Sequence, residues 1–160
     1  MPTNVSNDGR HDFDFLQGSW VAVNRKLGKR LVGSDEWDEF PTRLTSRPLL
    51  GGLMNVDELF VPGSDGGVTL RVFHPDTGEW SVYWAAAGTR TVDTPVVGRF
   101  VDGVGEFYSD DTWEGTPVRV RYAWDSRDAE HPQWHQAFSV DGGETWEVNW
   151  IATFSRAEEQ

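Results

Sequence analysis

The feature that most constrains the fold is the regular alternation of short β-rich runs with glycine-containing turns. The turn sequences are Gly51-Gly52, 63–67, 75–78, Asp102-Gly103, Glu114-Gly115 and 141–143. Glycine and its Asp neighbours supply the positive φ angles that β-hairpin turns need. The runs between them are rich in Val, Thr, Phe, Tyr and Trp, and they predict about ten strands. The predicted strands are 19–27, 35–47, 53–61, 67–74, 79–86, 95–101, 104–110, 117–125, 133–140 and 145–155.

The hydrophobic pattern excludes most helical architectures. No segment sustains a 3.6-residue apolar period, so helices covering a parallel sheet are not expected. An open sheet of so many strands would leave unpaired edges, and closure into a barrel removes them. We therefore predict an all-β fold, a single antiparallel up-and-down β-barrel of about ten strands, in preference to a two-sheet sandwich.

The chain length supports one hydrophobic core, because 160 residues bury enough surface for a single full domain. The polar start of the chain predicts a disordered tail over residues 1–12, followed by a barrel domain over residues 13–160. Phe13, Phe15 and Leu16 predict a short helical plug packed against the barrel floor.

Charge and composition narrow the classes of partner. The chain has 26 acidic and 14 basic residues, a net charge of -12 that repels phosphates and anionic lipid, so neither nucleic acid nor a membrane is expected as a partner. It has no cysteine, which excludes disulfides and thiolate sites. No apolar run approaches the ~18 residues of a membrane helix and no export signal is evident, so we expect a cytoplasmic protein.

Cofactors are not expected either. The four histidines show no metal-ligand spacing, and no nucleotide-binding glycine motif or serine-hydrolase elbow is present. We predict no metal and no cofactor. The sequence makes no prediction about oligomeric state.

Two residues at opposite ends of the strand series predict how one end of the barrel closes. Gly18-Ser19-Trp20 opens the first strand and Arg156 ends the last one. A guanidinium stacked on the indole would form a cation–π contact worth roughly 0.5–2 kcal/mol. We predict that Trp20 and Arg156 seal the barrel structurally.

Four segments carry a family resemblance that covers nearly the whole chain. They are Phe13-Asp14-Phe15-Leu16-Gln17-Gly18-Ser19-Trp20, Glu36-Trp37-Asp38-Glu39-Phe40, Val97-Gly98-Arg99-Phe100 and Trp146-Glu147-Val148-Asn149-Trp150. Together they resemble an uncharacterised bacterial family of lipocalin-like proteins in the calycin superfamily. The resemblance implies a small calycin-type barrel and brings no assigned reaction to particular residues.

A second motif is interpreted as a turn rather than as a site. Ser139-Val140-Asp141-Gly142-Gly143-Glu144-Thr145-Trp146 fits the Asp box of sialidase-like propellers, in which the Asp side chain accepts backbone N–H bonds across a hairpin. A propeller repeats such a box in every blade, whereas this chain has one copy and is too short for four blades. We therefore predict a structural hairpin here.

Strand periodicity predicts which side chains line the barrel, because successive residues point to opposite faces. We expect the more aromatic face to point inward. The predicted inward residues are Trp20, Ala22, Asn24, Trp80, Val82, Trp84, Val118, Val120, Tyr122, Trp124, Trp134, Gln136, Phe138, Trp146, Val148, Trp150, Ala152 and Phe154. Of these, the predicted ligand-binding residues are Asn24, Trp84, Tyr122, Trp124, Gln136, Phe138 and Trp150, with the amides of Asn24 and Gln136 orienting the ligand.

The opposite register would build a charged chamber. It would place Asn55, Asp57, Arg71, Arg119, Arg121, His135, Glu147 and Asn149 inside. Buried charges must be paired, as Arg121 with Glu147 or Arg71 with Asp57 would be. We expect these residues to face solvent. If the protein is an enzyme, Glu147, Asp57 and Arg121 are the predicted acid–base residues.

The function expected from these patterns is the binding of a small, largely apolar or aromatic molecule in a Trp-rich lumen. One alternative is a cofactor-independent isomerase or cyclase, for example of natural-product biosynthesis, that uses the lumen as a shape template with a buried acid or base. Another is a structural or interaction domain whose aromatic residues fill the barrel as a solid core.

Overall fold

The computed structural model of the protein describes residues 9–157 as an all-β fold. The strands are β1 (Gly18–Leu27), β2 (Trp37–Leu49), β3 (Met54–Phe60), β4 (Gly67–His74), β5 (Glu79–Ala86), β6 (Thr91–Val92), β7 (Val96–Val101), β8 (Val104–Trp113), β9 (Thr116–Asp125), β10 (Gln133–Ser139) and β11 (Glu147–Arg156). Two short 3₁₀ helices accompany them, η2 (Asp14–Leu16) and η3 (Leu50–Gly52).

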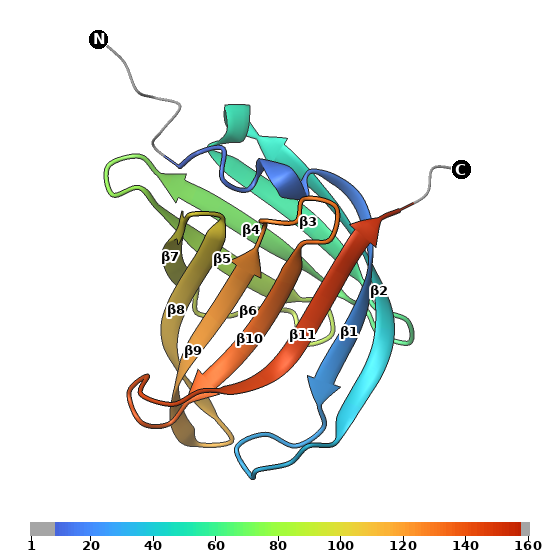
Figure 1. Cartoon of the computed structure of the whole chain (residues 1–160), viewed down its shortest axis with the longest axis vertical. Helices are drawn as coiled ribbons and strands as arrows, with labels where there is room; N and C mark the ends of the chain where they lie inside the picture. The colour runs from blue at the N-terminus through green and yellow to red at the C-terminus, as the bar shows by residue number, and fades with distance from the viewer. Residues whose placement is uncertain (1–8, 158–160) are drawn as a thin grey trace.

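The strands form one closed antiparallel barrel (Figure 1). Each long strand pairs with its neighbours in the chain, β1 pairs with β11, and β4 pairs with β5. The two-residue strand β6 only extends the edge of β5, so ten strands make the barrel. The predicted up-and-down barrel is confirmed, and closure leaves no long unpaired edge within the described residues.

Alternation along the strands produces the inside and the outside of the barrel. In β1, Trp20, Ala22 and Asn24 are buried, whereas Val23 and Arg25 are exposed. This period of two is the pattern expected of a half-buried strand, and it carries the aromatic residues inward.

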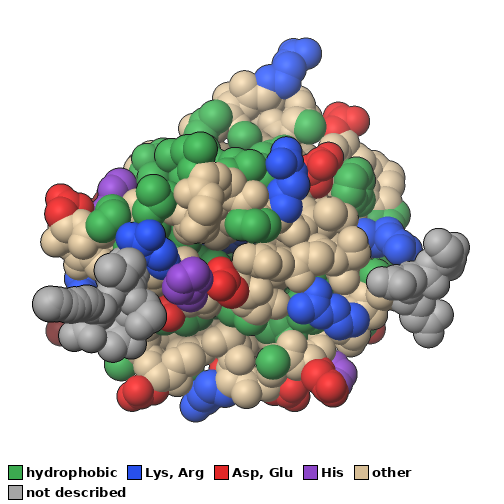
Figure 2. All heavy atoms as spheres, turned by 90° about the horizontal axis from the view of Figure 1, so that it is seen from above, with side chains coloured by type: hydrophobic (Ala, Val, Ile, Leu, Met, Phe, Trp, Pro, Cys, Tyr) green, Lys and Arg blue, Asp and Glu red, His purple; other side chains and the backbone are tan. Residues whose placement is uncertain are grey.

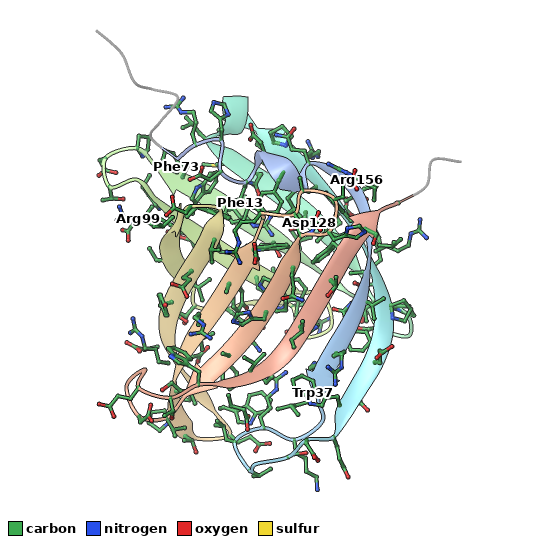
Figure 3. The ribbon with its side chains drawn as sticks, in the orientation of Figure 1. Phe13, Trp37, Phe73, Arg99, Asp128 and Arg156 are labelled. Carbon is green, nitrogen blue, oxygen red and sulfur yellow. The ribbon has the colours of Figure 1, made fainter. Side chains whose placement is uncertain are left out.

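One end of the barrel is filled by aromatic packing around η2. The Phe13 ring lies 5.1 Å from Trp80, 4.9 Å from Phe100 and 5.6 Å from Phe107, measured between ring centroids. Figure 3 shows Phe13 and Phe73 together at this end, and Figure 2 looks onto it and shows a surface of packed side chains. The predicted helical plug is confirmed, and we call this end the closed end.

The predicted contact between Trp20 and Arg156 is also present at the closed end. The Arg156 guanidinium carbon lies 3.8 Å from the centroid of the Trp20 ring. Arg156 also donates hydrogen bonds to the carbonyls of Gln17 and Phe15, and the Trp20 indole donates to the Leu16 carbonyl at 2.9 Å. These bonds connect the plug to β1, the first strand of the chain, and to β11, the last.

Gly18 permits this contact. Its φ is +105°, and a Cβ atom there would lie 2.6 Å from Nη1 of Arg156. A larger residue would therefore meet both backbone strain and a clash.

The Asp-box sequence forms the predicted structural hairpin between β10 and β11. Oδ1 of Asp141 accepts the Thr145 backbone N–H at 2.9 Å and the Ser139 hydroxyl at 2.7 Å. The Ser139 hydroxyl in turn accepts the Gly143 N–H at 2.8 Å. These bonds satisfy the turn backbone without any ligand.

The tail expected over residues 1–12 lies outside the described residues as far as residue 8. Residues 9–12 form a turn, and the Gly9 carbonyl accepts a hydrogen bond of 3.2 Å from the Trp80 indole. Across residues 9–157, no helix has both the length and the apolar character to span a membrane.

Candidate functional site

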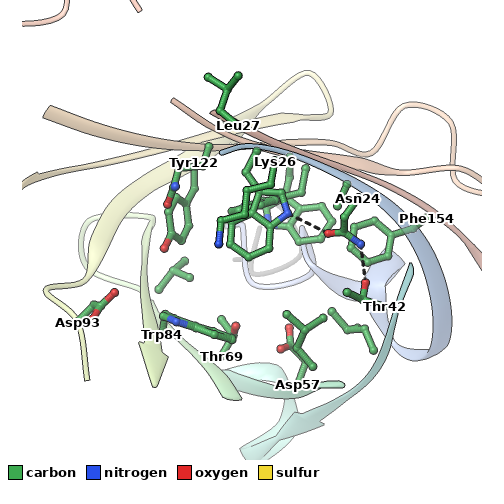
Figure 4. A pocket seen from close by; sticks show the side chains of 18 of the residues that line it. Asn24, Lys26, Leu27, Thr42, Asp57, Thr69, Trp84, Asp93, Tyr122 and Phe154 are labelled. Atoms are coloured by element: carbon green, nitrogen blue, oxygen red, sulfur yellow. Dashed lines mark hydrogen bonds between the residues drawn. The ribbon is translucent and has the colours of Figure 1, made fainter. Parts of the chain in front are cut away.

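The barrel encloses a cavity of about 430 Å³ between the closed end and the β1–β2 loop. The aromatic residues therefore do not fill the barrel along its whole length. The lining residues are Asn24, Lys26, Leu27, Gly28, Arg30, Thr42, Leu44, Asp57, Leu59, Thr69, Arg71, Val82, Trp84, Asp93, Trp113, Tyr122, Trp124, Trp134, Gln136, Trp150, Ala152 and Phe154. Figure 4 shows the space that these side chains surround.

One wall of the cavity is aromatic and comes mainly from β9, β10 and β11. The rings of Tyr122 and Trp134 meet edge to face at 5.3 Å, and those of Trp134 and Trp150 do so at 5.5 Å. Trp124 and Phe154 continue the wall toward the closed end, with ring centroids 5.4 Å apart. Such contacts fix each ring against its neighbour, so the wall is formed before any ligand arrives.

Hydrogen bonds from β1, and between β10 and β11, hold the aromatic wall in place. The Trp150 indole donates to Oδ1 of Asn24 at 2.9 Å, and Nδ2 of Asn24 donates to the Thr42 hydroxyl at 2.8 Å (Figure 4). Nε2 of Gln136 donates to Oδ1 of Asn149 at 2.8 Å. The two amides predicted to orient a ligand thus bind other side chains, and their effect on the cavity is to position its wall.

The Trp84 indole on β5 lies against Gly67 of β4, two residues along from its pairing partner Thr69. A Cβ atom on Gly67 would lie 2.4 Å from the Trp84 ring. Gly67 therefore leaves the space in which the indole lies.

The opposite wall is polar and contains a buried ion pair. Nη2 of Arg71 lies 2.7 Å from Oδ2 of Asp57, and both side chains are at most 3% exposed. Nη1 of Arg71 donates to Oδ1 of Asn55 at 2.9 Å, and its guanidinium carbon lies 4.9 Å from the Phe13 ring centroid. Neither Asp57 oxygen has a partner in hydrogen-bond geometry among the described residues. The pair is thus held by charge and leaves carboxylate lone pairs at the cavity wall.

The expectation that the polar and charged set faces solvent is wrong for four of its members. Asn149 is fully buried in β11, and Asn55, Asp57 and Arg71 are buried in β3 and β4. The residue pairings Asn55↔Arg71 and Asp57↔Thr69 put these side chains on the inner faces of β3 and β4. The charged register is thus realised on β3 and β4, and the aromatic register on β9 and β10. The buried charge of Arg71 is tolerated because its guanidinium contacts the Asp57 carboxylate and the Asn55 amide.

Two cationic side chains lie where the cavity opens toward the β1–β2 loop. Nζ of Lys26 lies 4.4 Å from the Trp150 ring centroid, and the guanidinium carbon of Arg30 lies 4.6 Å from that of Trp113. Burial lowers the pKa of the Lys26 amine, with a further contribution from Arg30. Burial also lowers the pKa of Arg30, although the Glu147 carboxylate opposes this change. We call this end of the cavity the mouth.

Tyr122 and Asp93 are the other titratable groups at the mouth. Burial raises the pKa of the Tyr122 phenol, and the nearby carboxylates of Asp93 and Asp111 add to the shift, so the phenol stays protonated at neutral pH. Partial desolvation raises the pKa of Asp93, and Asp111 raises it further. The phenol can therefore donate a hydrogen bond at this point of the cavity.

The structure brings most of the predicted ligand-binding residues to one cavity. The predicted residues that line it are Asn24, Trp84, Tyr122, Trp124, Gln136 and Trp150. Phe138 is buried next to it, with its ring centroid 5.8 Å from that of Trp113 and 5.4 Å from the Arg30 guanidinium carbon.

The three predicted acid–base residues lie in different parts of the barrel. Asp57 lines the cavity, whereas Oε1 of Glu147 accepts the Leu31 backbone N–H at 2.8 Å and holds the β1–β2 loop. Arg121 lies on the outer face, 4.5 Å from the Trp146 ring centroid and 3.3 Å from Nε2 of His135. The suggested pairing of Arg121 with Glu147 is therefore wrong.

A β-bulge explains why the side chains near the start of β11 face the side opposite to the predicted one. The pairing steps from Gln136↔Trp150 to Ala137↔Val148, so Asn149 is an extra residue in β11. The bulge reverses the side-chain alternation before Trp150. The prediction that Trp146 and Val148 point inward is wrong for this reason, and Trp146 instead packs against Tyr108 with ring centroids 6.0 Å apart.

Sequence reasoning left several lining residues out of the predicted site. The main ones are Lys26, Arg30, Thr42, Thr69, Asp93, Trp113 and Trp134. The alternation that placed Asn24 inside also places Lys26 inside, so that signal was present. Arg30 and Asp93 lie in loops, where no periodicity indicates direction.

Within the described residues, no group of three or more His, Asp or Glu side chains is arranged to hold a metal ion. Asp57 beside Arg71 and Tyr122 at the mouth are two of the polar groups that line the cavity and can make hydrogen bonds there.

Comparisons with known proteins add no assignment, since the sequence matches no protein-family model and no curated protein. The closed ten-stranded antiparallel barrel is consistent with a lipocalin-like fold.

Proposed function

We propose that this protein binds a small, largely apolar or aromatic molecule inside the barrel. The observation that carries the proposal is the cavity of about 430 Å³, which remains open although five of the nine tryptophans line it. Its volume lies in the range of about 300–1,000 Å³ that is typical of small-molecule sites. An aromatic core that served packing alone would be expected to close this space.

The two walls differ chemically, so they favour one orientation of a ligand in the cavity. The aromatic wall offers ring faces and edges for an apolar or conjugated ligand. The polar wall offers the Thr42 and Thr69 hydroxyls and the Asp57 carboxylate to the edge of that ligand (Figure 4). Because hydrogen bonds and ring contacts already fix the aromatic wall, little ordering is needed on binding.

A cavity-filling variant tests the proposal with N-phenyl-1-naphthylamine, a neutral fluorescent probe. Ala152 is buried, lines the cavity and lies between Asn24 and Trp134 in the strand pairing. We expect the wild-type protein to bind the probe and Ala152→Phe to weaken binding at least about tenfold, since 1.4 kcal/mol of lost contact suffices.

The matched control is Thr153→Phe, which adds the same ring at the next residue on the exposed face. It is expected to bind the probe as the wild type does. Equal effects of the two variants would contradict the proposal. So would a wild-type protein that binds neither this probe nor any compound of a broad apolar and aromatic panel.

A second candidate function is a cofactor-independent isomerase or cyclase. It is favoured by one observation, the Asp57 carboxylate in the lumen within 2.7 Å of a guanidinium. A shaped cavity can hold a reactive conformer while such a carboxylate accepts a proton. A ligand found by binding would be incubated with protein and followed by NMR. Conversion by the wild type but not by Asp57→Asn, which should still bind, is expected. An unchanged ligand spectrum would count against catalysis.

A further inference from the structure

Lys26 and Arg30 are held over the same mouth by different aromatic rings. Lys26 lies over Trp150, and Arg30 lies over Trp113 and Phe138. Both side chains line the cavity and are half-buried. Their aliphatic stems and charged ends are therefore directed by packing instead of moving freely in solvent.

Neither cation has a carboxylate partner at contact distance. Among residues 9–157, no ion pair within 4.0 Å involves Lys26 or Arg30, although the chain has 26 acidic residues. The carboxylates whose charge acts on these cations are Asp38 on Lys26 and Glu147 on Arg30, and Glu147 already accepts the Leu31 N–H. Two like charges thus meet over one partly desolvated opening.

This arrangement includes two unfavourable contributions. Partial burial costs each cation part of its hydration, and each charge repels the other. A bound anion would relieve both penalties, because it would supply charge-assisted hydrogen bonds to an ammonium and a guanidinium at once. The net charge of -12 makes two cations without a carboxylate at contact distance more notable at a cavity, since the rest of the surface repels anions.

We propose that the ligand carries a single anionic group, such as a carboxylate or sulfonate, that binds between Lys26 and Arg30 while its apolar part occupies the lumen. This inference rests on the proposed function and names the ligand class more closely. It also fixes the orientation of the ligand. At the inner end Arg71 is already paired with Asp57, whose carboxylate would repel an anion. Asp93 is the acidic group lining the mouth, and it lies on the side of Trp84 and Tyr122 (Figure 4).

Two matched probes test the inference. 8-Anilinonaphthalene-1-sulfonate and N-phenyl-1-naphthylamine share one ring system, and only the first carries a charge. We expect Lys26→Met and Arg30→Gln each to weaken binding of the sulfonate about tenfold, the size expected for one charge-assisted contact. Binding of the neutral probe should weaken by a clearly smaller factor, because it makes no charge-assisted contact with either side chain.

Two further variants serve as controls. Arg25→Gln removes an exposed cation that lies 5.0 Å from the Trp37 ring, and it should leave both probes unaffected. Arg30→Lys retains the charge and should retain most of the sulfonate affinity. Ala152→Phe should weaken both probes, which shows that the sulfonate binds in the cavity.

The outcomes separate this inference from the proposed function. If the neutral probe binds and the sulfonate is insensitive to Lys26→Met and Arg30→Gln, the anion subsite is wrong and the binding function stands. An equal loss of both probes in these variants also overturns the subsite, because it indicates a general change of the mouth. If the wild type binds neither probe, the proposed function fails first.

Discussion

Arg156 stabilises the closed end through an aromatic ring and the plug backbone together. Its guanidinium lies over Trp20 and also donates to the carbonyls that end η2. The Trp20 ring is fully buried, whereas Arg156 itself is exposed. The cation thus covers an otherwise sealed indole and connects strand β11 to the start of β1.

We expect Arg156→Ala to lower the free energy of unfolding by about 1–2 kcal/mol, because it removes one cation–π contact and the bonds to two carbonyls. Urea unfolding followed by tryptophan fluorescence measures the change. Arg25→Ala removes a cation over Trp37 that makes no such backbone bonds, and it should cost less. Equal losses in the two variants would mean that the plug contacts contribute nothing.

At the scale of single elements, the hairpin between β10 and β11 depends on one ionised carboxylate. Hydrogen bonds from Thr145 and Ser139 lower the pKa of Asp141 below its ordinary value of 3.8. A carboxyl group whose pKa is lower in the folded state stabilises the fold above the pKa of the unfolded state. That contribution is complete at neutral pH and is lost as the pH falls below about 4.

We therefore expect Asp141→Ala to melt at a lower temperature than the wild type at pH 7, with a difference that shrinks as the pH is lowered from 5 to 3. Thermal unfolding followed by circular dichroism at each pH gives this comparison. Asp110→Ala removes an exposed carboxylate that has only a 3.7 Å contact with Arg119, and it should change little. A difference independent of pH would show that the Asp141 charge is not what holds the turn.

The strands show where sequence reasoning succeeds and where it fails. Turn glycines and β-rich runs predicted strands 67–74 and 79–86 with the bounds that the structure has. Period-two alternation then placed Asn24 and Tyr122 at the cavity. It failed across the bulge at Asn149, because one inserted residue reverses the faces and no residue type marks the insertion.

The site was predictable only where strand periodicity applied. β8 runs to Trp113, three residues beyond its predicted end, and so carries that indole to the mouth. Arg30 reaches the same place from a loop, through contacts with rings that are distant in sequence. The pairing of Asp57 with Arg71 was recognised as possible, but the choice of face depended on Asn55 and Phe13, which only the folded barrel brings to Arg71.

At the scale of the whole molecule, the barrel divides along its axis into a packed half and an open half. The closed end has Phe107 and Trp80 at no more than 1% exposure around the plug. The other half contains the cavity, so the side chains that line it have no packing contacts on that side. Local opening should therefore be easier at the mouth than at the plug, although both belong to one sheet.

Hydrogen exchange along β8 tests this division, because that strand runs from the closed end to the mouth. We expect amides near Phe107 to exchange slowly and those near Trp113 to exchange faster, measured by mass spectrometry of overlapping peptides. Bound 8-anilinonaphthalene-1-sulfonate should slow exchange near Trp113 and in the β1–β2 loop and leave the segment around Phe107 unchanged, since the proposed anion subsite lies at the mouth. Uniform exchange along β8, or protection by the probe confined to the closed end, would contradict this division of the barrel.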